Sequence, residues 1–197
     1  MGQAKQRKQA YQTATKAMLS ECDTEATTVA VAATRLFDHF IRPNRFTGGC
    51  YHVSMTLHRF LSDKHNIATQ VVVGYVNDGT DDIMISHAWL EYRGRKIDLN
   101  LHIMENPDIT RPGDLIVMDR ILLPGLQAYT YHTERTGRYL KAAEDMLADP
   151  DIAAIAKHKD EEHRVMLARS KDRELMDAYI SMAPSHMGYQ AMTAALV

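Results

Sequence analysis

The stretch IMISHAWLEYRGRKIDLNL, residues 83–101, predicts a β-hairpin. Its first half is rich in isoleucine and aromatic residues, as strands are. Gly94 then supplies the conformational freedom that a tight turn needs. The chain returns through RKIDLNL, so we expect residues 83–93 and 95–101 to pair as neighbouring antiparallel strands.

Two further strands are expected beside this hairpin. IATQVVVGYV, residues 67–76, is dense in β-branched side chains and ends at the turn sequence NDGTDD. LIVMD, residues 115–119, predicts a shorter strand after the Pro-Gly pair at 112–113. Together with the hairpin, these strands indicate an antiparallel meander.

Helical periodicity precedes the meander. Residues 25–41 space their apolar side chains as an amphipathic helix does, with Thr24 as the expected N-cap and Pro43 as the expected end. After the loop RPNRFTGG, a second helix is expected from Cys50 to about residues 63–66. The apolar face of this second helix consists of Val53, Leu57, Phe60 and Leu61.

Helix-forming residues without strand signals fill the chain after about Thr133. They form two stretches, 138–149 and 161–182, which Pro150 separates and Pro184 closes. The order of helices, antiparallel strands and helices predicts an α+β fold. The expected organisation is a basic arm or solvated helix over 1–20, an α+β core over 21–132 and a helical extension over 133–197.

The bulk properties are those of an ordinary soluble globular chain. The 197 residues are 45% hydrophobic and carry a formal net charge of −2, which gives no reason to expect a nucleic-acid or anionic-membrane partner. No apolar run reaches the length of a membrane span, and the basic start MGQAKQRKQAYQ lacks the apolar core of a signal peptide. A cytoplasmic location is therefore expected, where the two cysteines would be reduced.

Cys50 stands at the expected start of a helix, directly after Gly48 and Gly49. A helix N-terminus stabilises negative charge through its unpaired N–H groups and its dipole, and the thiolate is the nucleophilic form of cysteine. The two glycines would allow a substrate to approach closely. By itself this context favours a small buried side chain over a nucleophile, because cysteine is among the most buried residue types.

His87 and Asp98 are the chemical partners that a nucleophilic Cys50 would need. His87 lies in the middle of one predicted strand between apolar neighbours, and Asp98 lies on the returning strand. A carboxylate buried there must be paired, and an imidazole is a partner that the carboxylate would orient. Asn100 shares the face of Asp98 by alternation and is the second candidate for this orienting role. The alternative for His87 is a core histidine bonded to Ser86 or to a backbone carbonyl.

The sequence GGCYHVSMTLHRFL…TQVVVGYV…SHAWLEYRGRKIDLN resembles the transglutaminase-like branch of the papain-type cysteine enzymes, including the bacterial leader peptidases of lasso-peptide maturation. The likeness rests on the order of a helix-borne Cys, a strand-borne His in HAWLEYRG and an Asp in KIDLN, and it covers roughly residues 44–101. It implies a core in which the nucleophile helix packs on an antiparallel sheet, with additional C-terminal helices here. It also implies Cys50 as nucleophile, His87 as general base and acid, and Asp98 as orienting group.

The resemblance points to further residues around the reacting atoms. Papain-type enzymes often complete the oxyanion hole with a side-chain amide shortly before the cysteine. Asn44 occupies that place, and it equally suits a helix cap or a turn. Gly49, Tyr51 and Trp89 are the substrate-pocket candidates. Tyr51 stands where many relatives carry Trp, and Trp89 also suits core packing.

The remaining histidines do not suggest a metal site. In KHKDEEHR, residues 157–164, His158 and His163 are five residues apart and would point in different directions around a helix. This segment is expected to be a solvated charged helix. The histidines that follow Cys50 in the chain are also poorly spaced for chelation with its thiol, so no metal and no cofactor is expected.

The expected function is a cysteine-dependent amide acyl transfer through a thioester, with a protein or peptide as substrate. Hydrolysis, as in a peptidase or deamidase, ranks first because water is always available as the acceptor. The alternatives are a transglutaminase, which uses an amine acceptor, and a non-catalytic binding module that keeps the fold. The sequence indicates no oligomeric state.

Overall fold

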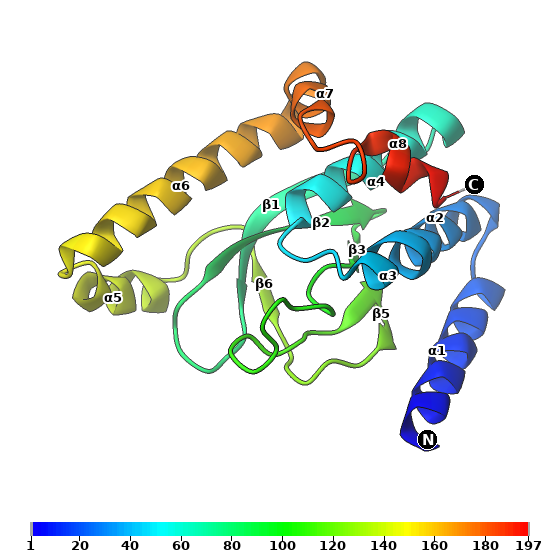
Figure 1. Ribbon diagram of the computed structural model, residues 1–197, viewed down its shortest axis with the longest axis horizontal. Coiled ribbons are helices and arrows are strands. Elements are labelled where there is room, and N and C mark those ends of the chain that lie inside the picture. Colours follow the sequence, from blue (N-terminus) through cyan, green and yellow to red (C-terminus); the bar gives the residue numbers. More distant parts are fainter. Residues whose placement is uncertain (1, 197) are drawn as a thin grey trace.

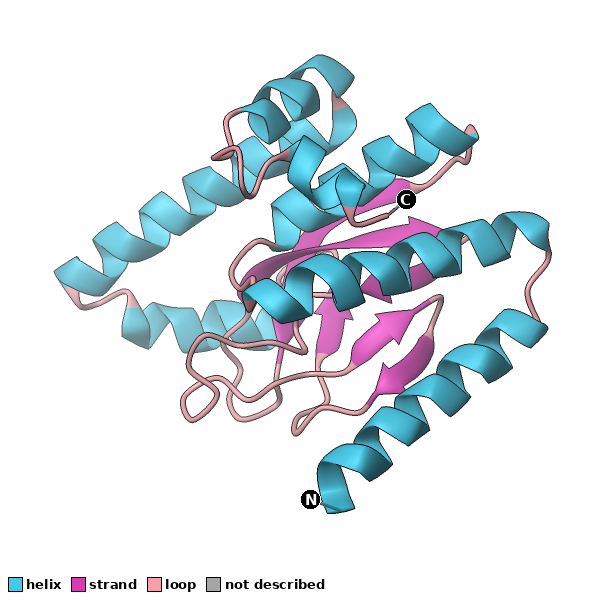
Figure 2. Ribbon diagram, turned by 45° about the vertical axis from the view of Figure 1, so that its right-hand side comes forward, coloured by secondary structure: helices cyan, strands magenta, loops and turns pink. Residues whose placement is uncertain are grey.

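The computed structural model, which describes residues 2–196, is built around one antiparallel sheet in the order β5-β4-β3-β2-β1-β6. Helices pack against this curled sheet and extend from both ends of the molecule (Figure 1, Figure 2). The fold is therefore α+β, as predicted. The strands are β1 (Gln70–Asn77), β2 (Ile85–Tyr92), β3 (Arg95–Asp98), β4 (Leu115–Val117), β5 (Arg120–Leu123) and β6 (Thr130–His132). The helices are α1 (Gly2–Ser20), α2 (Thr24–Leu36), the π-helical turn η1 (Phe37–Ile41), α3 (Arg42–Asn44), α4 (Cys50–His65), α5 (Gly137–Met146), α6 (Pro150–Lys171), α7 (Arg173–Ser181) and α8 (Tyr189–Ala194).

The predicted hairpin forms the centre of the sheet. β2 and β3 pair in antiparallel fashion, and Gly94 in the turn between them has a φ of 71°, in the left-handed region that favours glycine. β3 ends at Asp98, earlier than predicted, because the chain then turns away from the sheet. The strands predicted at 67–76 and 115–119 are β1 and β4.

The sequence does not predict β5 and β6, which are short strands of four and three residues. β6 pairs with β1 on the side away from β2, with Val76 opposite Tyr131. A strand of three residues is too short to show an alternating pattern of apolar and polar side chains. β6 nevertheless places Tyr131 next to the hairpin, where it contributes to the candidate site.

The helix predicted over residues 25–41 differs from the prediction at both of its ends. Its N-cap is Asp23 rather than Thr24, because the Asp23 carboxylate accepts the Ala26 N–H at 2.8 Å. The helical path also continues past Pro43 instead of ending there. The π-helical turn η1 stops before Pro43, which lies in the first turn of α3, where a missing backbone N–H costs little.

α4 begins at Cys50, as predicted, and packs across β1 and β2 (Figure 1). It ends at His65, and the left-handed backbone of the next residue, Asn66, forms a common C-terminal cap. The predicted apolar face is entirely buried, and its members are Val53, Leu57, Phe60 and Leu61. This burial holds the first turn of α4 against the sheet.

The C-terminal stretch predicted as one helix over 161–182 is divided between α6 and α7. The break is at Asp172, whose backbone is extended and whose carboxylate accepts the Leu175 N–H at 3.0 Å. Asp172 therefore acts as the N-cap of α7, a role that the helical periodicity does not reveal. Pro150 begins α6, in agreement with the prediction that it separates two helices.

Both ends of the chain pack on the central core. One apolar cluster includes residues of α2, α4 and the sheet together with side chains from the C-terminal helices, which are Met166, Met176, Ile180, Met192 and Leu196. Residues 1–20, for which the sequence left a helix or an arm open, contain α1, which packs on β5 through a face that buries Tyr11 and Met18. Across residues 2–196, no helix has both the length and the apolar character needed to cross a membrane.

Candidate active site

Cys50 is the first residue of α4 and is half-buried. The N-cap of this helix is Gly49, which has no side chain to satisfy the first N–H groups. Unpaired N–H groups at the start of a helix favour an anion, so the position of Cys50 suits a thiolate. The helix is held in this position by the apolar face that packs on the sheet.

His87 and Asp98 meet as the sequence predicts. The Nε2 atom of His87 lies 2.7 Å from Oδ2 of Asp98, and the two residues are only 4% and 2% exposed. They lie on the adjacent strands β2 and β3, which are joined by the tight turn at Gly94. The orienting partner of His87 is therefore the Asp98 carboxylate and not the Asn100 amide.

The charge on His87 is stabilised by its surroundings. Burial by itself would lower the pKa of His87, but the carboxylate of Asp98 and the sulfur of Cys50 outweigh this effect and raise the pKa to about 10. Burial would raise the pKa of Asp98, but the charge and hydrogen bond of His87 hold this pKa below its ordinary value. The two groups therefore form an imidazolium–carboxylate pair at neutral pH.

Cys50 is the third member of the arrangement. Its side chain lies close enough to the His87 ring to contribute, after Asp98, to the raised pKa of His87. Asp98 occupies Nε2 of the ring, so Nδ1 is the nitrogen available to Cys50. The structure thus brings the three predicted residues together, with the imidazole between the thiol and the carboxylate.

Asp98 has a further partner that the sequence does not predict. The Tyr131 hydroxyl donates to Oδ2 of Asp98 at 2.8 Å, and the Asn100 backbone N–H donates to Oδ1 at 3.0 Å. Burial and the Asp98 charge raise the pKa of Tyr131, so its phenol stays protonated and remains a donor. The Nζ atom of Lys96 lies 3.3 Å from the centre of the Tyr131 ring, which helps to fix the ring.

Two of the residues proposed to surround Cys50 have other contacts. The amide of Asn44 donates to the Phe40 carbonyl at 2.8 Å, which fits the helix-capping alternative rather than the oxyanion role. Gly49 lies against a ring: a Cβ atom there would be 2.1 Å from Cε1 of Phe46. This close packing on the Phe46 ring is the contact in the structure that favours glycine at position 49.

Trp89 and Asn100 lie beside the His87–Asp98 pair. Trp89 is 3% exposed, stacks next to His87 with ring centres 6.4 Å apart, and donates its indole N–H to Glu91. These contacts make Trp89 a buried wall of the site. The side-chain amide of Asn100 is buried and has no hydrogen-bond partner among residues 2–196.

The charged segment KHKDEEHR is not solvated throughout, and the prediction for His163 is wrong. His163 is only 9% exposed, stacks on Tyr75 with ring centres 4.4 Å apart, and lies with Nδ1 2.5 Å from Oγ of Ser86. Ser86 in turn is 2.6 Å from the Tyr51 hydroxyl. Helix α6 has a weak apolar pattern, so only its packing on β1 reveals this buried position.

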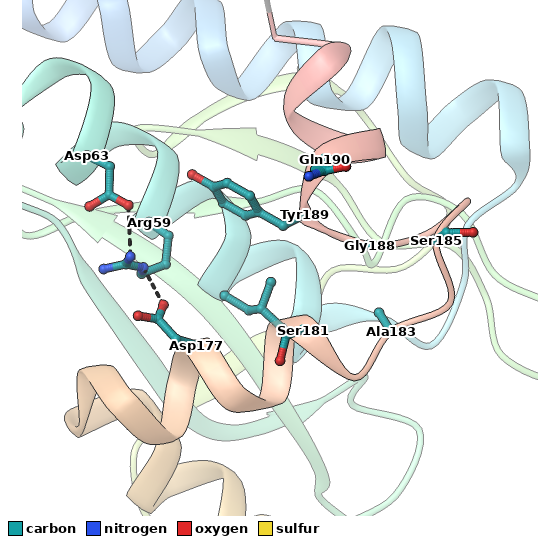
Figure 3. A pocket seen from close by; sticks show the side chains of 10 residues that line it. Arg59, Asp63, Asp177, Ser181, Ala183, Ser185, Gly188, Tyr189 and Gln190 are labelled. Carbon is teal, nitrogen blue, oxygen red and sulfur yellow. Dashed lines mark ion pairs between the residues drawn. The ribbon is translucent and has the colours of Figure 1, made fainter.

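A hollow of about 490 Å³ lies between α4 and the C-terminal helices, away from the three candidate residues. Figure 3 shows Arg59 in its wall, paired with Asp63 at 2.8 Å and with Asp177 at 2.7 Å. Because both carboxylates already bind the guanidinium, this cluster is explained by the contact between α4 and α7. In the part of the chain that the structure describes, no three His, Cys, Asp or Glu side chains gather as a metal site would require.

Comparison of the chain with protein-family models, with curated proteins and with solved structures found no match.

Proposed function

We propose that this protein is a cysteine-dependent amide acyl-transfer enzyme with a papain/transglutaminase-like core, acting on a protein or peptide by hydrolysis. The observation that carries the proposal is the placement of His87 between Cys50 and Asp98, with a 2.7 Å bond to the carboxylate. The proposal is supported by the position of Cys50 at the start of a helix, of His87 on a central strand and of Asp98 on the next strand, which is the order that the resemblance implies.

In the proposed reaction, the Cys50 thiolate attacks the carbonyl carbon of an amide, and the negative charge moves to the carbonyl oxygen. The backbone N–H of Cys50, at the unpaired start of α4, can stabilise this oxyanion. As the C–N bond breaks, His87 gives the proton on Nδ1 to the leaving amine, and the substrate acyl group remains on sulfur as a thioester.

Water completes the proposed cycle. Neutral His87 takes a proton from the water molecule, whose oxygen attacks the thioester, and the thiolate leaves as the carboxylic acid product forms. His87 is charged again at the end of this step. Asp98 holds the ring in one orientation and stabilises its positive charge throughout, because its carboxylate remains bonded to Nε2.

The first test compares the two cysteines of the chain, which are both half-buried and so provide an internal control. Iodoacetamide should alkylate Cys50 at least tenfold faster than Cys22 at pH 6, because the start of α4 and the positive charge of His87 both favour the anionic, attacking form of a neighbouring thiol. Mass spectrometry of the peptides measures both rates. His87→Ala should remove the difference, whereas equal rates in the wild-type protein would contradict the proposal.

The second measurement addresses acyl transfer itself. p-Nitrophenyl acetate should acetylate Cys50 and then lose the acetyl group to water, which intact-protein mass spectrometry detects as a transient adduct. Cys50→Ala should form no such adduct, and Cys22→Ser should behave as the wild-type protein. An acetyl group that stays on Cys50 would argue for the binding-module alternative, since that module needs no deacylation.

A further inference from the structure

A chain of three polar side chains connects α6 to the candidate active site. The Tyr51 hydroxyl lies 2.6 Å from Oγ of Ser86, and this oxygen lies 2.5 Å from Nδ1 of His163. Tyr51 and His163 are 8% and 9% exposed, and Ser86 is half-buried between them. These hydrogen bonds thus join α4, β2 and α6 in a region with little access to water.

Two members of this hydrogen-bonded series are sequence neighbours of Cys50 and His87. Tyr51 directly follows Cys50, and Ser86 directly precedes His87. The hydrogen bond between Tyr51 and Ser86 therefore fastens the helix of the thiol to the strand of the imidazole at the residues next to both. Small changes in the separation of two reacting groups have large effects on rate.

His163 is itself held firmly. Its ring stacks on Tyr75 of β1 at an interplanar angle of 12°, and the guanidinium of Arg135 lies 5.0 Å from the centre of the same Tyr75 ring. Burial, followed by the charge of Arg135, lowers the pKa of His163 and keeps the imidazole neutral. A neutral ring can accept the Ser86 proton at Nδ1, which leaves a lone pair of Ser86 Oγ for the Tyr51 hydroxyl.

We propose that His163 is a positioning residue for Cys50 and His87, which it holds in register through Ser86 and Tyr51. This role rests on the proposed acyl-transfer function, since only a reaction between Cys50 and His87 depends on their separation. It also gives the C-terminal helical segment a part in the active site. His163 acts on Cys50 and His87 only through the hydroxyl groups of Ser86 and Tyr51.

The test uses the full-length chain and two variants of nearly equal size. His163→Asn keeps a polar atom near the position of Nδ1, whereas His163→Leu removes it. The exposed His158 on the same helix provides the matched control, His158→Leu. For each variant, the rate of Cys50 alkylation by iodoacetamide relative to that of Cys22, and the rate of acetylation by p-nitrophenyl acetate, are measured together with the thermal midpoint.

His163→Leu should slow both reactions of Cys50 about tenfold, as the loss of one well-placed hydrogen bond does. His163→Asn should recover most of the rate, and His158→Leu should react as the wild-type protein. Tyr51→Phe should slow the reactions of Cys50 to the same extent. Adding His163→Leu to Tyr51→Phe should cause no further loss of rate, because both changes break the same series of hydrogen bonds.

The outcomes separate this proposal from the one before it. If His87→Ala slows Cys50 but folded His163→Leu reacts within twofold of the wild-type protein, the positioning role is wrong and the acyl-transfer proposal stands. If wild-type Cys50 reacts no faster than Cys22, both proposals fail. If His163→Leu does not fold, Tyr51→Phe decides the question, because this variant loses only a single oxygen atom. An unchanged rate of Cys50 alkylation in Tyr51→Phe overturns the positioning role, and a slower rate supports it.

Discussion

At the scale of single residues, Asp98 shows how this protein accommodates a buried charge. A carboxylate that is only 2% exposed would be costly without partners. It receives hydrogen bonds from the imidazole of His87, the hydroxyl of Tyr131 and the backbone N–H of Asn100. These donors together keep Asp98 ionised, and an ionised Asp98 keeps His87 charged.

This pair makes stability depend on pH in a direction that can be stated. The pKa of His87 rises from 6.5 in the unfolded chain to about 10 in the folded one, so the folded state holds more protons between these values. The stability that the pair contributes is complete below pH 6.5 and is lost as the pH rises toward 10. We therefore expect the free energy of unfolding to fall by a few kcal/mol over this range.

Urea denaturation at a series of pH values measures this effect. Asp98→Asn removes the charge that raises the pKa of His87, so its free energy of unfolding should be lower at pH 6.5 and should change much less between pH 6.5 and 10. A wild-type protein whose stability rises over this interval would contradict the charge assignment. His158→Leu, at an exposed position on α6, is the control for unrelated effects of substitution.

At the scale of elements, the junction before α4 determines where this helix begins. Gly49 fits against the ring of Phe46, which also packs edge-on against Phe40 with ring centres 5.5 Å apart. A side chain at position 49 would have to move a ring that is held on its other side. Glycine at this point therefore lets the loop bring Cys50 to the sheet without displacing the Phe46 ring.

Gly49→Ala should destabilise the protein by about 1–3 kcal/mol, the usual cost of overpacking. It should also slow the reaction of Cys50 with iodoacetamide, since the start of α4 must shift. Gly137→Ala is the matched control, because a Cβ there meets no atom within 4 Å. Equal thermal midpoints for the two variants would contradict this prediction, because they would show that the Phe46 ring can move aside at no cost in stability.

Elements with strong local patterns could be predicted from the sequence, and those made by tertiary contact could not. The hairpin around Gly94 and the helix from Cys50 carry clear signals, and they bring His87 near Asp98. Tyr131 lies on a strand too short to show a pattern. His163 is surrounded in sequence by charged residues, and it is buried only because α6 packs on β1.

At the scale of the whole molecule, the C-terminal third is part of the core. Its buried residues belong to the same apolar cluster as α2 and α4. Figure 1 shows α8 beside α4, while α6 runs along the outside of β1. The helical extension expected from the sequence is thus packed against the sheet and against α4.

A chain that ends at His132 should not fold cooperatively. The apolar side chains that it would lose from the core are Met166, Met176, Ile180, Met192 and Leu196. Each is worth about 1.5–3 kcal/mol when fully buried, and together they rival the total stability of about 5–15 kcal/mol that is usual for a protein. Circular dichroism during heating and size-exclusion chromatography test this, and a sharp transition at the wild-type midpoint would contradict it.

The order of these residues along the chain has a consequence for biosynthesis. Cys50, His87 and Asp98 all precede Tyr131 and His163, which hold them from later strands and helices. During translation, Cys50, His87 and Asp98 would therefore emerge from the ribosome well before the residues that we infer align them. If His163 has the proposed role, Cys50 reaches its full reactivity only after the last third of the polypeptide has emerged, so translation itself delays the onset of full activity.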